Sequence, residues 1–189
     1  MKKLYTLLAL TISFSMNAQM SDNSANNNSA GSNAVAMGDS TIASGTAATA
    51  MGLYTIASGS SSTAMGAFTE ASISYSTAMG RNTTAIATSS TAMGRGTTAS
   101  GEESTAMGRS TTASGSRSTS MGGYTTASDF ASLVIGQYNS SGSSVTNSAT
   151  VFNTANTAFV IGNGTNSSNK SDAFKVMFNG DTTVSNDLT

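Results

Sequence analysis

The sequence predicts an all-β protein built of stacked coils, a β-solenoid, and three observations support this fold class. A 14-residue unit recurs in unbroken register over a little more than half of the chain. Each unit contains two short runs of Thr, Ser and Ala ending mostly in Gly, and Thr, Ser and Gly are unfavourable inside helices. Large apolar residues are too few and too evenly spread for one conventional core, which stacked repeats do not need.

The repeat is most visible in a Met-Gly pair at every fourteenth position, with Ile replacing Met in the eighth copy. The residue before each pair is nearly always small, and the consensus is Ser-Thr-Ala-Met-Gly-x-x-Thr-Thr-Ala-Ser-Gly-x-x. The pairs that define the structural repeat are Met37, Gly38, Met51, Gly52, Met65, Gly66, Met79, Gly80, Met93, Gly94, Met107, Gly108, Met121, Gly122, Ile135 and Gly136.

The length of the unit indicates its structure. Fourteen residues hold two strands, each of about five residues, and two short corners, whereas helical repeats need roughly 33 residues or more. Equivalent residues of successive coils would then stack about 4.8 Å apart. The Gly after each Met is expected to end the first strand and to permit the backbone torsions of a tight corner.

Side-chain alternation predicts which residues share a face. In one representative coil, Thr91 and Met93 point to one side and Ala92 to the other. We expect the stacked Met side chains to be buried, because an exposed apolar stripe would be adhesive. The Ala side would then be a flat surface on which copies of the chain pack, while the second strand faces water. The repeat therefore predicts a symmetric homo-oligomer, without fixing the number of subunits.

The N-terminal residues 1–18 are typical of a secretory signal peptide. Lys2 and Lys3 precede an apolar stretch too short to span a bilayer, and Ala18 is a plausible cleavage site. An Asn/Ser-rich linker (19–33) would then lead into the repeats (34–139). Removal of the two lysines lowers the net charge of −1 by two, so we expect no nucleic-acid partner. We also expect no membrane insertion of the mature segment. Without Cys, disulfides do not hold it together.

The repeat resembles the head repeats of YadA-like trimeric autotransporter adhesins, in which a Ser-Val-Ala-Ile-Gly strand precedes a Thr-x-Ala-x-Gly strand. Here Ser-Thr-Ala-Met-Gly (62–66) and Ser-Leu-Val-Ile-Gly (132–136) stand in that place. The resemblance covers about 34–139 and implies a left-handed parallel β-roll and a homotrimer. It also implies an adhesin head at the cell surface, outer membrane or outside the cell, attaching to host or environmental surfaces. The partner would be an extracellular matrix protein, a glycan or another surface ligand.

The chain departs from that family pattern by Met for Ile and Thr for Val in most repeats. We therefore do not carry over the collagen binding that some members attribute to such repeats. The resemblance leaves the ligand itself open.

The C-terminal part departs from the repeat. Residues 140–157 are rich in Ser, Asn and Thr and predict a long loop or an enlarged coil, followed by capping strands and a hairpin over 158–189. Residues 158–162 look like one more first strand, and Asn179-Gly180 is a strong hairpin signal. We expect Phe159, Phe174 and Phe178 to plug the end of the roll.

The same segment resembles, more weakly, the region preceding an endosialidase-type intramolecular chaperone domain. A structural segment of a tail-fibre-like protein is therefore an alternative function. Neither that domain nor a membrane anchor precedes Thr189, so we expect a fragment or a chain attached in another way.

Enzymatic function has little support in the sequence. Without His or Cys there is no Ser-His pair, no thiolate nucleophile and no usual zinc site. The carboxylates are scattered, and adjacent Glu102 and Glu103 are expected to point apart into solvent. The Gly-Gly-x-Gly-x-Asp pattern of calcium-binding β-rolls is missing. We therefore predict a protein that is no enzyme and needs no cofactor or metal.

Two periodic patterns carry functional alternatives. Arg81, Arg95 and Arg109 occupy one corner position in three successive coils, so they predict a column of like charges. This column is either a solvated edge or an anion-binding stripe for acidic glycans. The Thr pairs, such as Thr97 and Thr98, raise ice binding as a third function. Adjacent side chains point to opposite faces, however, which disfavours a flat Thr array.

Overall fold

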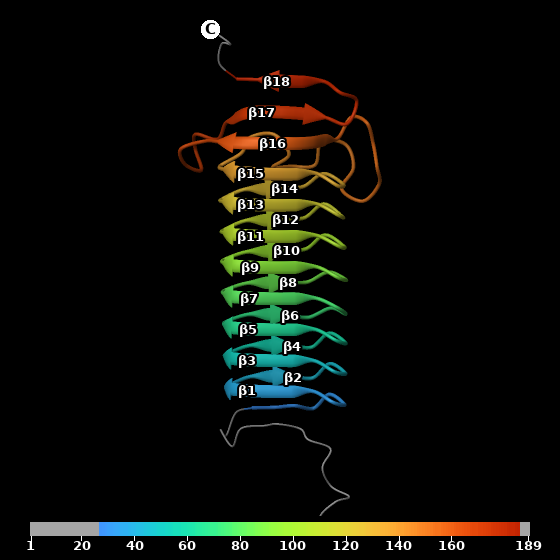
Figure 1. Ribbon diagram of the computed structural model, residues 1–189, viewed down its shortest axis with the longest axis vertical. Coiled ribbons are helices and arrows are strands. Elements are labelled where there is room, and N and C mark those ends of the chain that lie inside the picture. Colours follow the sequence, from blue (N-terminus) through green and yellow to red (C-terminus); the bar gives the residue numbers. More distant parts are fainter. Residues whose placement is uncertain (1–26, 186–189) are drawn as a thin grey trace, which may run out of the picture.

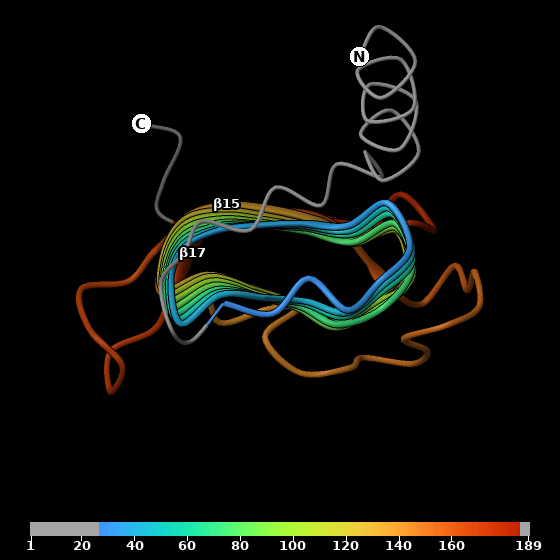
Figure 2. The same cartoon turned by 90° about the horizontal axis from the view of Figure 1, so that it is seen from below.

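The computed structural model describes residues 27–185, which form a narrow all-β solenoid with coils of 14 residues (Figure 1). Each coil gives one long strand to one sheet and one short strand to a second sheet that faces it (Figure 2). The long strands are β1 (Val35–Asp39), β3 (Thr49–Leu53), β5 (Thr63–Ala67), β7 (Thr77–Arg81), β9 (Thr91–Arg95), β11 (Thr105–Arg109), β13 (Thr119–Gly123) and β15 (Leu133–Gln137). The short strands are β2 (Ile42–Ala43), β4 (Ile56–Ala57), β6 (Glu70–Ala71), β8 (Thr84–Ala85), β10 (Thr98–Ala99), β12 (Thr112–Ala113) and β14 (Thr126–Ala127).

Both sheets of the roll are parallel and follow the sequence period. Strand β7 pairs with β9 so that Met79 lies opposite Met93 and Arg81 opposite Arg95, and the neighbouring long strands repeat this register. The solenoid of 14-residue coils predicted from the repeat is therefore confirmed. The second strands are shorter than expected, with two residues each instead of about five.

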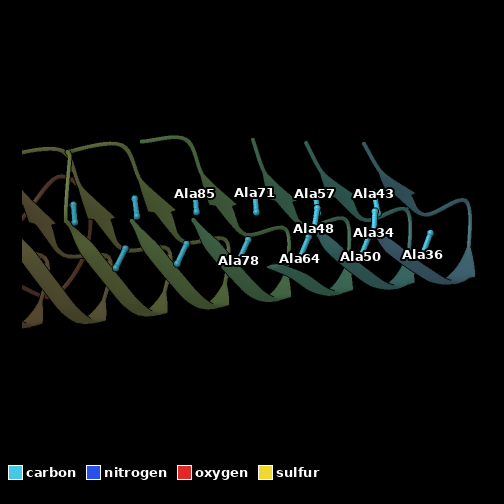
Figure 3. Packing of buried hydrophobic residues seen from close by; sticks show 14 residues of the cluster. Ala34, Ala36, Ala43, Ala48, Ala50, Ala57, Ala64, Ala71, Ala78 and Ala85 are labelled. Carbon is cyan, nitrogen blue, oxygen red and sulfur yellow. The ribbon is translucent and has the colours of Figure 1, made fainter. Parts of the chain in front are cut away.

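The interior of the roll is filled by small side chains from both sheets (Figure 3). The alanines that precede Met, such as Ala78 and Ala92, are fully buried, as are Ala85 and Ala99 of the second sheet. Two sheets joined by such short corners lie too close together for larger side chains. The expectation of a buried Met column and an exposed Ala face was therefore wrong. Methionine points outward, and Met79 is 37% exposed.

The glycine after each Met has a positive φ, between 93° and 129° over the eight coils. A Cβ at Gly94 would collide with the carbonyl oxygen of Gly108 in the next coil. Contrary to expectation, the first strand does not end at this glycine. It continues for one residue, and the following residue, Asn82 in one coil, makes the turn with φ of 53°. The glycine thus allows close stacking of coils, and its neighbour turns the corner.

The C-terminal part extends only the sheet of long strands. Strand β16 (Thr157–Asn163) pairs in parallel with β15, so Phe159 continues the position of Leu133 and Val160 that of Val134. Strands β17 (Asp172–Met177) and β18 (Thr182–Val184) then add in antiparallel order, joined by the turn at Asn179 and Gly180 (Figure 1).

The phenylalanines do not plug the roll, which corrects the expectation from the sequence. Phe159, Phe174 and Phe178 all stay partly exposed. The interior at this end is filled instead by Val134 and Val160, both fully buried. The reason is the alternation of β16, which places Val160 on the inner side and Phe159 on the outer side.

Residues 140–156 leave the roll and return to it, held by buried polar side chains. The Asp129 carboxylate accepts hydrogen bonds from the backbone N–H groups of Thr146 (2.6 Å) and Thr157 (2.8 Å). The Asn156 side chain accepts from the N–H of Ser148 at 2.8 Å and donates to its carbonyl oxygen at 2.7 Å. The excursion lies beside the second sheet, opposite the sheet of long strands (Figure 2).

At the N-terminal end, the roll begins within the expected linker. Asn28 bridges to Ile42, and the Gly31 N–H donates to the carbonyl oxygen of Ala43 at 3.1 Å. The predicted signal peptide, residues 1–18, lies outside the described residues.

Candidate functional site

Side chains of the roll fill its interior, so only residues on the exterior are able to contact another molecule. Three exterior surfaces differ in chemistry. The Met face is the outer side of the long strands, with its columns of Thr and Met. The Met-Gly corner is formed by the two residues after each Met-Gly pair. The Ser-Gly corner, on the opposite edge, holds the residues that connect each short strand to the next long strand.

The Met face is apolar and partly exposed. Its central column runs through the stacked methionines, of which Met79 and Met121 are 37% and 38% exposed. Ile135 and Ile161 continue this column at the C-terminal end. The excursion of residues 140–156 lies on the other side of the roll, so it does not cover this face (Figure 2).

The Met-Gly corner carries the arginine column expected from the sequence. Arg81, Arg95 and Arg109 end strands β7, β9 and β11, lie in register and are exposed. Within residues 27–185, the one salt bridge joins Arg117 and Glu103, at the other corner. The column therefore has no carboxylate partner among the described residues, and its three charges face solvent.

Aromatic side chains stand beyond both ends of this arginine column. Tyr54 and Phe68 stack with ring centroids 5.3 Å apart, and Tyr124 and Tyr138 with centroids 4.5 Å apart. The Arg109 guanidinium lies 5.2 Å from the centre of the Tyr124 ring, which joins the column to one pair. Partial burial, followed by the neighbouring Tyr124, raises the pKa of the Tyr138 phenol.

The Ser-Gly corner, in contrast, holds one ion pair. The Arg117 Nε donates to Glu103 Oε2 at 2.7 Å, and the Arg117 guanidinium lies 5.5 Å from the Phe130 ring centre. The hydrogen bond and then the charge of Glu103 raise the pKa of Arg117. Glu102 and Glu103 are both exposed, but Glu103 bonds across to the next coil instead of only facing solvent.

Buried hydroxyl groups line the interior, with an irregularity in one coil. Five Thr side chains have no hydrogen-bond partner for Oγ1 in the described part of the chain: Thr55, Thr69, Thr83, Thr97 and Thr111. In the next coil, Ser120 replaces the usual Ala, and its hydroxyl lies 2.9 Å from that of Thr125. Thr83 is buried while Thr84 is partly exposed, so adjacent threonines do point to opposite faces.

Between residues 27 and 185, no three metal-ligating side chains of His, Cys, Asp or Glu come together. Over the same residues, no helix is long and apolar enough to cross a membrane. The exposed apolar column, the unpaired charges and the stacked rings all suit contact with another molecule.

A model of the YadA head domain repeat matches the chain at 29–55, 57–83, 85–111 and 99–125, about half of its length. The chain belongs to the YadA head family. The resemblance inferred from the Met-Gly repeat is thereby confirmed. No curated protein matches the chain.

YadA heads are non-enzymatic adhesin modules, form homotrimers in general and are exposed on the outer membrane. In this YadA head, each Met-Gly pair lies in a long strand and is in register with the pair of the next coil. Sequence reasoning missed the aromatic pairs beside the arginine column. Their signal was available, because Tyr54 and Phe68, like Tyr124 and Tyr138, are 14 residues apart.

Proposed function

We propose that this chain is the head of a trimeric surface adhesin, exported by its N-terminal signal peptide and carried on the outer membrane. Three left-handed rolls pack side by side through their Met faces and form one rod. The rod attaches the cell to host or environmental surfaces by many equivalent contacts, whose effective concentration raises a weak affinity. No catalytic step is involved.

The observation that carries the proposal is the Met face, which is partly exposed in the described part of the chain. A column of seven methionines at about 4.8 Å spacing is a long apolar stripe, and such stripes mark interaction surfaces. Thr side chains flank it, and the excursion near the C-terminal end leaves it free. The head repeats of a family that forms homotrimers favour three copies around this face.

Light scattering on the purified protein tests the assembly. We expect a mass three times that of the 18.9 kDa chain, less the signal peptide. The combined variant Met79→Ser, Met93→Ser and Met107→Ser should fall to one chain while its circular dichroism keeps the strand signal. A stable monomer of the unmodified chain would contradict the proposal.

A matched control uses the opposite sheet, which bears equally exposed apolar side chains. Ile42, Ile56 and Ile86 are 36%, 38% and 43% exposed on the outer side of that sheet or just beyond it. Their combined change to Ser removes similar apolar area and should leave the trimer intact. Equal dissociation of both variants would show that the Met face has no special part in assembly.

Attachment is tested separately, on cells that display the protein. Cells carrying the unmodified chain should be retained on coated surfaces more than cells carrying an empty vector. The methionine variant should lose retention together with its trimeric mass. Retention that persists without the trimer would argue against multivalent attachment.

A further inference from the structure

The Met-Gly corner changes its chemistry along the rod. From the first coil to the eighth, the residue after the glycine is Asp39, Leu53, Ala67, then the three arginines, then Gly123 and Gln137. The residue after that is Ser40 in the first coil, aromatic in the next two coils, Asn82, Gly96 or Ser110 in the three arginine coils, and aromatic in the last two coils. Basic coils with small neighbours are thus bounded by aromatic coils at both ends.

This arrangement keeps three like charges close together without an acidic partner among the described residues. Equivalent atoms of successive coils lie about 4.8 Å apart, where like charges repel even at an exposed surface. Nothing in the fold requires arginine at this position, since the other coils have Asp, Leu, Ala, Gly or Gln there. The column is therefore better explained by an external anion than by the stability of the roll.

The aromatic pairs indicate which class of anion fits the corner. Tyr54 and Phe68 are 52% and 50% exposed although their rings stack, so their ring edges and outer faces remain accessible. Flat aromatic faces pack against the C–H groups of sugar rings, while guanidinium groups bind sulfate or carboxylate with two parallel hydrogen bonds. A linear column with rings at both ends suits an extended polymer better than a small ion.

We propose that the Met-Gly corner binds an acidic polysaccharide along the rod axis. Arg81, Arg95 and Arg109 contact its sulfate or carboxylate groups, and Phe68 and Tyr124 pack against sugar rings at either end. The inference deepens the proposed adhesin function, because it names the ligand class of a head displayed outside the cell. The other corner, where Arg117 is paired with Glu103, takes no part.

Titration of the purified protein with size-fractionated heparin and with uncharged dextran tests the site. Heparin should bind with an affinity that falls as salt rises, and dextran should not bind. The combined variant Arg81→Gln, Arg95→Gln and Arg109→Gln should weaken heparin binding about tenfold or more. Its melting temperature should stay equal or rise, because repulsion in the column is removed. A merely structural role would lower it.

The matched control removes the same three charges elsewhere. Arg117→Gln, Lys170→Gln and Lys175→Gln together change the net charge equally but lie outside the Met-Gly corner. We expect little change in heparin affinity. Equal weakening by the two triple variants would overturn the site, because it would reduce binding to net charge alone.

A second pair of variants tests the rings. Phe68→Asn and Tyr124→Asn should each weaken heparin binding, and folding should be kept because Asn82 adopts the same positive φ at this corner. Unchanged affinity in both would overturn the part assigned to the rings. Tighter binding of single-stranded DNA than of heparin would overturn the ligand class.

The same experiments distinguish failure of the polysaccharide site from failure of the adhesin proposal. The arginine variant should keep the trimeric mass, whereas the methionine variant should lose it. A trimer that retains cells on surfaces but does not bind heparin would refute the polysaccharide site alone.

Discussion

The inner and outer sides of the long strands differ in how much the residue type varies from coil to coil. On the inner side, the residue before Met is Ala in six successive coils, then Ser120 and Val134, and all eight are fully buried. On the outer side, the residue two positions after Met is Asp, Leu, Ala, Arg, Gly or Gln. Eight coils of one chain thus show which positions the fold restricts and which it leaves free.

The difference teaches where the specificity of the molecule can reside. Space between two close sheets allows only small residues, so the inner columns repeat almost without change. The corners bear no such restriction, and there the coils differ in charge and in aromatic content. We therefore expect inner substitutions to change stability and corner substitutions to change binding.

Breaking the stacking of coils at glycine should have the largest effect. A Cβ in Gly94→Ala would collide with the Gly108 carbonyl oxygen, at a φ of 118° that L-residues rarely adopt. We expect a loss of about 3 kcal/mol or more in the free energy of unfolding, measured by thermal or denaturant unfolding. Gly123→Ala is the control, because a Cβ there meets no atom within 4 Å. Equal losses would contradict the close-approach explanation.

Filling the interior should cost less than this collision but remain severe. Ala92→Leu places a large side chain between the sheets, and we expect a loss of about 1–3 kcal/mol in the free energy of unfolding. Met93→Leu changes the adjacent, outward residue and should leave chain stability nearly unchanged. The same unfolding measurement compares the two variants. A well-tolerated Ala92→Leu would mean that the interior has room that the buried alanines do not indicate.

Pairing an unpartnered hydroxyl should give a smaller effect of opposite sign. Ser120 meets Thr125 at 2.9 Å, while Thr111 in the preceding coil has no partner for its Oγ1. Ala106→Ser copies the paired arrangement, and we expect a gain of about 0.5–1.5 kcal/mol in the free energy of unfolding. Ala106→Cys, of similar size but with a weak donor, should not stabilise. A loss with Ser would show that the two coils differ in more than this residue.

Removing the exposed ion pair should change stability least. Arg117 and Glu103 are both exposed, so solvent screens their attraction. We expect Arg117→Gln to leave the melting temperature unchanged within error, at low and at high salt. A clear drop that disappears at high salt would instead assign the Ser-Gly corner a stabilising part.

The period was sufficient to predict the coils and their register, and the consensus within each repeat was sufficient to predict the family. Residues 14 apart had to stack in register, so the positions of Arg81, Arg95 and Arg109 in one column followed directly. The hairpin at Asn179 and Gly180 was also visible, because this pair favours a tight turn. These features depend on residue spacing and on local backbone preference, and both can be read directly from a sequence.

The orientation of the strands could not be predicted in the same way. Alternation separated Met93 from Ala92, but it did not say which side was inside. General hydrophobicity favoured a buried Met, whereas the structure buries Ala92 between the sheets and leaves the Met column on the outer side. Likewise, Val160 and not Phe159 fills the C-terminal end, because β16 continues the register of β15.

The sequence by itself therefore determined the unit, its stacking and the composition of each column. Only the tertiary structure decided which columns face inward. It also decided that Arg117 at one corner has an acidic partner, whereas the arginine column at the other corner has none among the described residues. The physical reason is that the repeat length fixes the number of residues in each coil at 14. The space between the two sheets then favours small side chains, even over larger and more hydrophobic ones.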